Sequence, residues 1–156
     1  MPDISVHTAQ YIDKKIKERF IEKLPQYCEG VDKWEIHWSP TQAFERPEDL
    51  FWLDFFFNPY EPSQKELGTG GRNRFEGFTQ INICVPLNSD IVTDEDPIGT
   101  SPAFICSADI ERAFKRGDIF NGIQIVKFQE YTSALQVYDD FCFLPVRIFW
   151  RADLPN

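Results

Sequence analysis

The two histidines, His7 and His37, are the side chains of this sequence best suited to acid–base chemistry near neutral pH. His7 lies near the N-terminus, and His37 falls in a short alternating segment without a recognisable nucleophile motif. A Ser–His–Asp or Cys–His arrangement would have to be assembled by the tertiary fold from distant residues. The sequence therefore predicts no catalytic residues.

Two groups of adjacent carboxylates could also do chemistry. Asp94-Glu95-Asp96 and Asp139-Asp140 are the densest acidic positions. Catalytic carboxylate pairs face each other across a reacting bond, whereas sequence neighbours in extended chain point apart. Both groups are therefore interpreted as solvated turns.

A glycine cluster, Gly68-Thr69-Gly70-Gly71, resembles a phosphate-binding loop only at first sight. The dinucleotide fingerprint would require glycine at the position of Asn73, and a strand pattern follows where a helix would be needed. No GxxxxGK motif is present. We interpret the cluster as a turn that leads Arg72 and Arg74 into a long strand.

The four cysteines, Cys28, Cys84, Cys106 and Cys142, are widely scattered. Neither a CxxC motif nor a Cys/His spacing typical of zinc sites occurs, so no metal and no cofactor are expected. The chain begins without an apolar leader and contains no apolar run of about 20 residues. These features predict a soluble protein made in a cytoplasm, with reduced, buried thiols and no membrane partner.

The net charge of −9 arises from 25 acidic and 16 basic residues. No basic stripe is present, which argues against tight nucleic-acid binding, because phosphate neutralisation dominates such affinity. The acidic excess either maintains solubility or lines a conduit for a polyanion. Fifteen phenylalanines indicate either an aromatic core or a subunit interface. The two interpretations of the acidic charge stay open, and so do the two interpretations of the phenylalanines.

Periodicity predicts a single α+β domain over residues 1–156. Apolar residues at helical spacing indicate one helix over 6–24, ended by Pro25, and a second that begins with Ser101-Pro102 and is capped by Gly117. Alternating or apolar runs indicate strands over 33–38, 50–57, 74–86, 123–131 and 137–151. We expect an antiparallel or mixed sheet of four to five strands, with both helices packed on one face.

The segment Gly68–Pro86 is the strongest structural lead. Its strand is longer than the usual five or six residues, so we expect its first half to protrude as a β-arm or hairpin. Gly77 would mark a bulge or bend in it. In the last strand, Pro145 predicts an edge position or a bulge, because proline cannot donate to the ladder. Alternation predicts that one face of the strand 74–86 carries Phe75, Gly77, Thr79, Ile81, Ile83 and Val85. In the last strand it places Leu144, Val146, Ile148 and Trp150 inward and Arg147 and Arg151 outward.

The order of these motifs resembles the tail terminator family of long-tailed phages. The similarity is carried by Glu66-Leu67-Gly68, Gly71-Arg72-Asn73-Arg74 and the run Gly77–Pro86, followed by Phe114-Lys115-Arg116-Gly117 near the end of the second helix. The order of elements agrees over residues 11–153. The chain departs from the family in Asn88–Thr100, where it has a longer, acidic loop.

The resemblance implies a non-enzymatic virion protein of the tail or neck, assembled in the cytoplasm of a bacterial host. It would form a homohexameric ring that caps the tail tube, stops its polymerisation and provides the head–tail joining surface. Its partners would be copies of itself, the major tail tube protein and a head-completion or connector protein. DNA would pass through the lumen without specific binding.

Two hypotheses about residues follow from this reading. We expect the tip of the arm to contact a neighbouring subunit or the tube through Arg72, Arg74, Phe75 and Phe78. We expect the acidic loop to face the lumen or a docking surface through Asp90, Asp94, Glu95 and Asp96. Two other classes stay open: another tail-completion or head-closure factor, and a small cytoplasmic enzyme or adaptor whose site would gather His37 with carboxylates.

Overall fold

The computed structural model describes residues 4–27, 34–38, 51–60, 63–64, 72–86, 101–131, 135–137 and 141–155, and it is an α+β fold. Within these ranges the chain forms two helices and a mixed sheet. Their bounds are α1 (Ile4–Tyr27), β1 (Trp34–His37), β2 (Phe51–Pro59), β3 (Ser63–Gln64), β4 (Arg72–Pro86), α2 (Ser101–Ala113), β5 (Ile119–Phe120), β6 (Ile123–Glu130), β7 (Gln136–Val137) and β8 (Phe141–Pro155).

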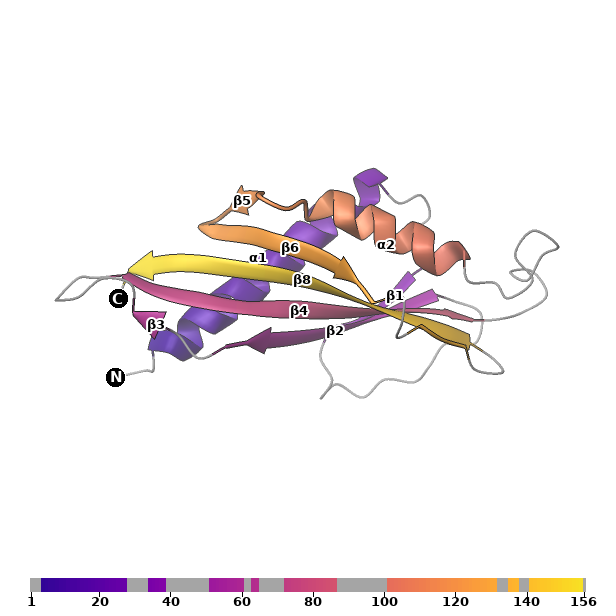
Figure 1. The fold of residues 1–156 in the computed structure, drawn as a ribbon, viewed down its shortest axis with the longest axis horizontal. Helices are drawn as coiled ribbons and strands as arrows, with labels where there is room; N and C mark the ends of the chain where they lie inside the picture. Colours follow the sequence, from indigo (N-terminus) through magenta and orange to yellow (C-terminus); the bar gives the residue numbers. More distant parts are fainter. Residues whose placement is uncertain are drawn as a thin grey trace.

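The sheet is organised around the antiparallel pair β4 and β8. These two 15-residue strands pair along their whole length, from Arg72 opposite Pro155 to Pro86 opposite Phe141. The strand order is β1-β2-β4-β8-β6-β5, with β3 added to β4 and β7 added to β8. Among the described strand pairs, β1 and β2 alone are parallel. Figure 1 shows β4 and β8 side by side along the long axis of the molecule, with α1 passing behind them.

Side-chain alternation along these two strands gives one buried face, which is apolar apart from Thr79. Ile81 and Ile83 of β4 lie opposite Val146 and Leu144 of β8, and all four are completely buried. Both helices pack on this face through α1 residues Ile12, Ile16 and Phe20 and α2 residues Ala103, Cys106, Ile110 and Ala113. The predicted inward positions of both long strands and the apolar face of α2 are thus confirmed. On α1 the prediction holds for Ile12, Ile16 and Phe20, whereas Ile21, which helical spacing also placed on the apolar face, is 57% exposed.

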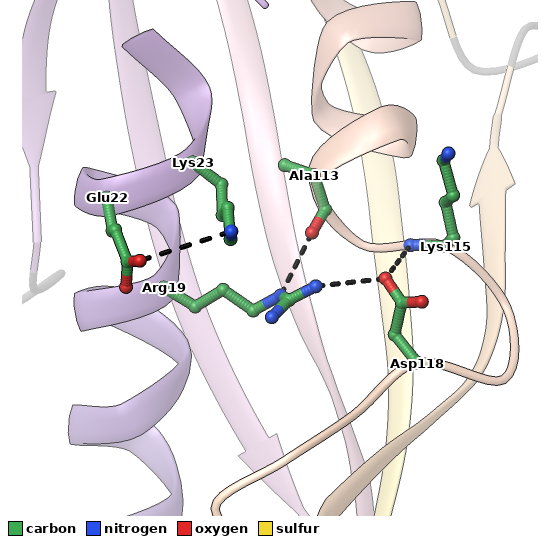
Figure 2. Close-up of polar contacts among 6 residues, drawn as sticks. All are labelled: Arg19, Glu22, Lys23, Ala113, Lys115 and Asp118. Carbon is green, nitrogen blue, oxygen red and sulfur yellow. Dashed lines mark hydrogen bonds and ion pairs between the residues drawn. The ribbon is translucent and has the colours of Figure 1, made fainter. Parts of the chain in front are cut away.

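An arginine joins the two helices to the turn that follows α2. Arg19 Nε donates to the carbonyl oxygen of Ala113 (3.0 Å), and one terminal nitrogen donates to Asp118 Oδ2 (2.9 Å), as Figure 2 shows. The Ala113 carbonyl belongs to the last turn of α2, where it has no partner within the helix. The guanidinium also lies 4.5 Å from the ring centre of Phe120. Arg19 thereby caps α2 and positions the β5–β6 hairpin.

Several predicted details of the elements are wrong. Helix α1 continues past Pro25 to Tyr27, and α2 ends at Ala113, four residues before Gly117. Gly117 instead occupies a turn with φ of 91° and donates its N–H to Ile125 of β6. The five predicted strands are present, but β3, β5 and β7 bring the described total to eight. Each of these three is only two residues long, which is too short for a periodic signal.

The first half of β4 is paired within the sheet and does not stand out as a detached arm. Its residues 72–78 pair with β8, which extends to Pro155, beyond the predicted end at Arg151. On its other side, Gly77 and Phe78 pair with Pro59 and Asn58 of β2. The length of β4 is therefore explained by a partner strand of equal length, a pairing that the sequence pattern of one strand does not reveal.

Gly77 is explained by close packing, and Pro145 is explained by a gap in the hydrogen-bond ladder beside β8. The register of β4 with β8 is continuous through Gly77, so no bulge occurs there. Instead, a Cβ at position 77 would overlap the Asn58 carbonyl oxygen and lie 2.7 Å from Trp150 Cζ2. Pro145 lies in a central strand, but its carbonyl accepts from Tyr131 N, just beyond the last β6 pair. The missing N–H of Pro145 therefore faces the gap between β6 and β7.

Replacing Gly77 with alanine should strongly destabilise the fold. The added methyl group would displace backbone atoms of β2 and the ring of Trp150, at a cost of about 3 kcal/mol. Urea unfolding of Gly77→Ala followed by circular dichroism measures this cost. Gly117→Ala is the control, because nothing lies near its Cβ and only its positive φ opposes substitution, at about 1 kcal/mol. An equal loss in both variants would contradict the steric explanation.

Removing the Arg19 side chain should lower the free energy of unfolding by about 2 kcal/mol, because two charge-assisted hydrogen bonds are lost. Lys14→Ala on the same helix is the control. The Lys14 side chain is 70% exposed and its ion pair with Glu18 is 3.9 Å long, so that change should cost less than about 0.5 kcal/mol. Thermal unfolding of both variants makes the comparison, and a small loss in Arg19→Ala would show that α2 is capped by other means.

Candidate functional site: the open face of the sheet

The second face of the sheet carries no helix in the described part of the chain. We call this surface the open face. It is formed by the β4 and β8 side chains that alternate with the core positions, together with their neighbours on β6. These side chains are Arg74, Glu76, Phe78, Gln80 and Asn82 of β4, Arg147, Phe149, Arg151 and Asp153 of β8, and Gln124, Lys127 and Gln129 of β6.

One end of the open face is held by an ion pair between the two central strands. Arg74 and Asp153 are opposite each other in register, and the guanidinium donates to both carboxylate oxygens at 2.8 and 3.0 Å. The bond to Asp153 raises the pKa of Arg74 above its ordinary value. This two-point geometry fixes the Arg74 side chain against its own sheet.

The middle of the open face is a packed row of rings and cations. Phe78 and Phe149, opposite each other in register, have ring centres 5.6 Å apart. The Arg147 guanidinium lies 4.4 Å from the ring centre of Phe78 and 4.8 Å from that of Tyr131, and its Nε donates to Gln80. Lys127 Nζ lies 4.6 Å from the ring centre of Phe149. The row is rigid because neighbouring strands hold every member.

Next to the open face, His37 of β1 and Asp54 of β2 form the arrangement that most resembles catalytic chemistry. Their Nδ1 and Oδ1 atoms are 3.1 Å apart. Burial raises the pKa of the Asp54 carboxyl, an effect opposed by its hydrogen bond and charge interaction with His37. In register, Asp54 is opposite Asn82, and Trp52 is opposite Cys84. Cys84 is 3% exposed, and its thiol donates to the carbonyl oxygen of Asn82. The neighbouring thiol is therefore sealed from substrate.

A hollow of about 460 Å³ lies beside β2 and does not include the His37–Asp54 pair. Asp13 and Lys17 of α1, which form an ion pair at 2.9 Å, line it with Trp38, Gln80, Asn82 and residues 55–58. In the described residues, β1 pairs only with Phe51–Asp54, so β2 beyond Asp54 has no strand partner on that side. The hollow thus adjoins a strand edge.

The predicted interface residues fall in different environments. Arg74 and Phe78 lie on the open face, whereas Phe75 is 5% exposed and belongs to the core, where it has no surface to offer a partner. The backbone of Arg72 pairs with Pro155 at the end of β4. The acidic positions Asp90, Asp94, Glu95 and Asp96 lie outside the described residues, as do the glycine cluster, Cys28 and Asp139-Asp140.

Sequence reasoning predicted that Arg147 and Arg151 point outward but did not connect them with Phe78. That connection depends on the register between β4 and β8, which are separated by 54 residues between Pro86 and Phe141. Phe149 and Lys127 were missed for the same reason. Alternation along the last strand contained the signal for Phe149, since it lies between the two outward arginines.

The described residues also bear on the cysteines, on metal-ligand clusters and on membrane-spanning helices. Cys84, Cys106 and Cys142 are reduced and buried, as expected. In the ranges that the structure describes, no three His, Cys, Asp or Glu side chains gather as metal ligands do. No helix in those ranges is long and apolar enough to cross a bilayer.

Comparison with known proteins finds one similar fold and gives no function. No family model matches the sequence. No curated protein matches it either. A solved structure, of a protein named only by an identifier, is similar with a TM-score of 0.55. The match covers 88% of this chain and 96% of that chain at 11% identity. At this identity the similarity shows a shared fold alone.

Replacing Asp54 with asparagine should change how stability depends on pH. Because burial raises the pKa of Asp54, the folded state binds its proton more tightly than the unfolded state, whose value is near 3.8. Wild-type stability should therefore fall as pH rises from 3.8 through the raised pKa, and Asp54→Asn should lack this contribution. Urea unfolding of both proteins between pH 3 and 6 measures the difference. A wild-type protein that gains stability relative to Asp54→Asn over this range would contradict the assignment.

Proposed function

We propose that this chain is a structural, non-enzymatic virion protein: a tail terminator that assembles as a homohexameric ring on a phage tail tube. The ring would stop tube polymerisation and offer a joining surface to a head-completion protein, while DNA passes through its lumen. The observation that carries the proposal is the open face, where aromatic and arginine side chains are presented by the two central strands. These are the residue types enriched at protein interfaces.

The one-sided architecture supports contact between unlike surfaces. Each copy has helices on one side of its sheet and the open face on the other. A contact that uses two different surfaces of identical subunits is heterologous, and it closes into a ring when the rotation between subunits is suitable. An isologous dimer, in contrast, would bury one self-complementary patch and close with two copies at that contact.

The end of the β4–β8 pair takes the place of the protruding arm in this proposal. Residues 72–78 and 149–155 pair with each other, and they are joined by β3 at Asn73 and Arg74, by β2 at Gly77 and Phe78, and by β6 at residues 149–152. A paired, twisted ribbon is stiffer than a single strand, and it can approach a neighbour without exposing two strand edges. Arg74 and Phe78 lie on this ribbon and remain our candidates for contact with the next subunit or the tube.

The edge of β2 offers a second point of contact. Beyond Asp54 it has no described strand partner on its β1 side, and the hollow lined by Trp38 and Phe56 lies beside it. An extended segment of another protein could add to such an edge through backbone hydrogen bonds. The tail tube protein is the proposed source of that segment.

Light scattering and electron microscopy test the proposed ring. Alone or mixed with tail tubes, the protein should form particles of six times the 18.3 kDa chain mass, or density at tube ends. A different ring stoichiometry would indicate another neck protein. A protein that stays monomeric and leaves tube ends bare would contradict the proposal.

Phe78→Ala should weaken ring formation about tenfold, because interface aromatics contribute on the order of 1–2 kcal/mol. Ile105→Ala is the control, since this 62% exposed side chain lies on α2, on the helix-covered side of the sheet. Circular dichroism must show that both variants keep the wild-type fold. Equal ring formation by the two variants would remove the open face from the interface.

A further inference from the structure

The hollow beside β2 lies along the edge of the strand and reaches both faces of the sheet. It is lined by four consecutive residues, 55–58, whose side chains alternate between the two faces. Asp13 and Lys17 of α1 line it from the side of the core, and Gln80 and Asn82 line it from the open face. A space that touches both faces and the strand between them has the position of an additional strand. Figure 1 shows β2 running past β1 along this margin of the sheet.

The backbone of β2 directs hydrogen-bonding groups into this space. Tyr60 N donates to Glu76 O at 2.7 Å, so the pair that follows Pro59 and Gly77 in register is a hydrogen-bonded pair of the ladder. Hydrogen-bonded and non-hydrogen-bonded pairs alternate between antiparallel strands. The N–H and C=O of Phe57, three residues before Tyr60, therefore point away from β4 and toward the hollow. Pro59 has the same orientation, and its missing N–H ends the row of donors there.

Asp13 gives this space a chemical preference. Its Oδ2 accepts from Lys17 Nζ at 2.9 Å, whereas its Oδ1 is buried and, among the contacts of the described residues, accepts no hydrogen bond. A buried carboxylate oxygen without a donor costs free energy, so a donor that reaches it is bound selectively. Because Asp13 lies on α1, in the layer beneath the sheet, the donor must be at the end of a long side chain. Lysine and arginine meet this requirement, and the net charge of −9 attracts them.

We propose that the hollow binds an extended, basic segment of a partner protein, which pairs with the edge of β2 and places one lysine or arginine against Asp13 Oδ1. Strand addition supplies backbone hydrogen bonds that any sequence can make, and Asp13 supplies the selection. Trp38, which packs against Phe20 and Phe55, closes the end of the hollow where β1 stops. The inference rests on the proposed function for the source of the segment, the tail tube protein, and adds the residue type that the segment must carry.

Two nine-residue peptides test the site. Both alternate threonine and valine, and the central residue is lysine in one and methionine, a neutral side chain of similar length, in the other. Fluorescence anisotropy of the labelled peptides should show that the wild-type protein binds the lysine peptide about tenfold more tightly than the methionine peptide. Methylation of the central backbone nitrogens of the lysine peptide should abolish binding, because the donors to the edge of β2 are then lost. Undiminished binding of the methylated peptide would exclude strand addition.

Asp13→Ala should remove the preference, so that this variant binds the two peptides equally. Glu18→Ala is the matched control and should keep the tenfold preference. Glu18 is also a carboxylate of α1 paired with a lysine, Lys15 at 3.1 Å, but it is not part of the lining of the hollow. Circular dichroism must show that both variants keep the wild-type fold. Equal binding of the two peptides by the wild type, or loss of the preference in both variants, would overturn the inference.

Amide hydrogen exchange locates the bound peptide. The Phe57 N–H should exchange rapidly in the free protein and slowly with the lysine peptide present. Slow exchange of this N–H in the free protein would mean that the protein itself occupies the edge, and the inference would be wrong.

The outcomes separate this inference from the proposed function. If the lysine peptide binds as expected but the protein leaves tail tubes bare, the site stands and the proposed function fails. If rings cap the tubes and neither peptide binds, the ring stands and the site is wrong.

Discussion

The continuous antiparallel pairing of β4 with β8 is the interaction on which the rest of the structure depends. Because side chains alternate with a period of two, a slip of one residue would place the core side chains of one strand beside the surface side chains of the other. The observed register places Ile81 opposite Val146 on one face and Phe78 opposite Phe149 on the other. One pairing therefore determines the hydrophobic core and the composition of the open face together.

The core face and the open face are stabilised by different kinds of contact. Under the helices, fully buried aliphatic and aromatic side chains exclude water, and Arg19 caps α2 so that both helices stay on this face. On the open face, half-buried rings are covered by the aliphatic and cationic parts of Arg147 and Lys127. The charged groups remain at the surface while their stems pack on the sheet. Such a surface is stable in a single chain yet presents charge to a partner.

Our proposal of a binding surface and not a reaction site rests on the same arrangement. The His37–Asp54 pair is the nearest approach to catalytic geometry, but the neighbouring thiol of Cys84 is buried, and the hollow beside β2 does not include the pair. Arg147 and Arg151 of the open face, in contrast, each donate from Nε to a glutamine on a neighbouring strand. Fixed donors on central strands favour recognition of a partner with complementary charge.

The sequence alone determined the helices, the five longer strands and the inward positions of β4 and β8, because periodicity of 3.6 or 2 is a local property. It also indicated that Arg147 and Arg151 point outward. Only the tertiary structure decided that β4 is paired to its end, that Gly77 is required by close approach of Trp150, and that Phe75 is buried while Phe78 lies beside Arg147. These facts depend on which strands pair and in what register, and pairing between segments so distant in the chain leaves no periodic trace in either one.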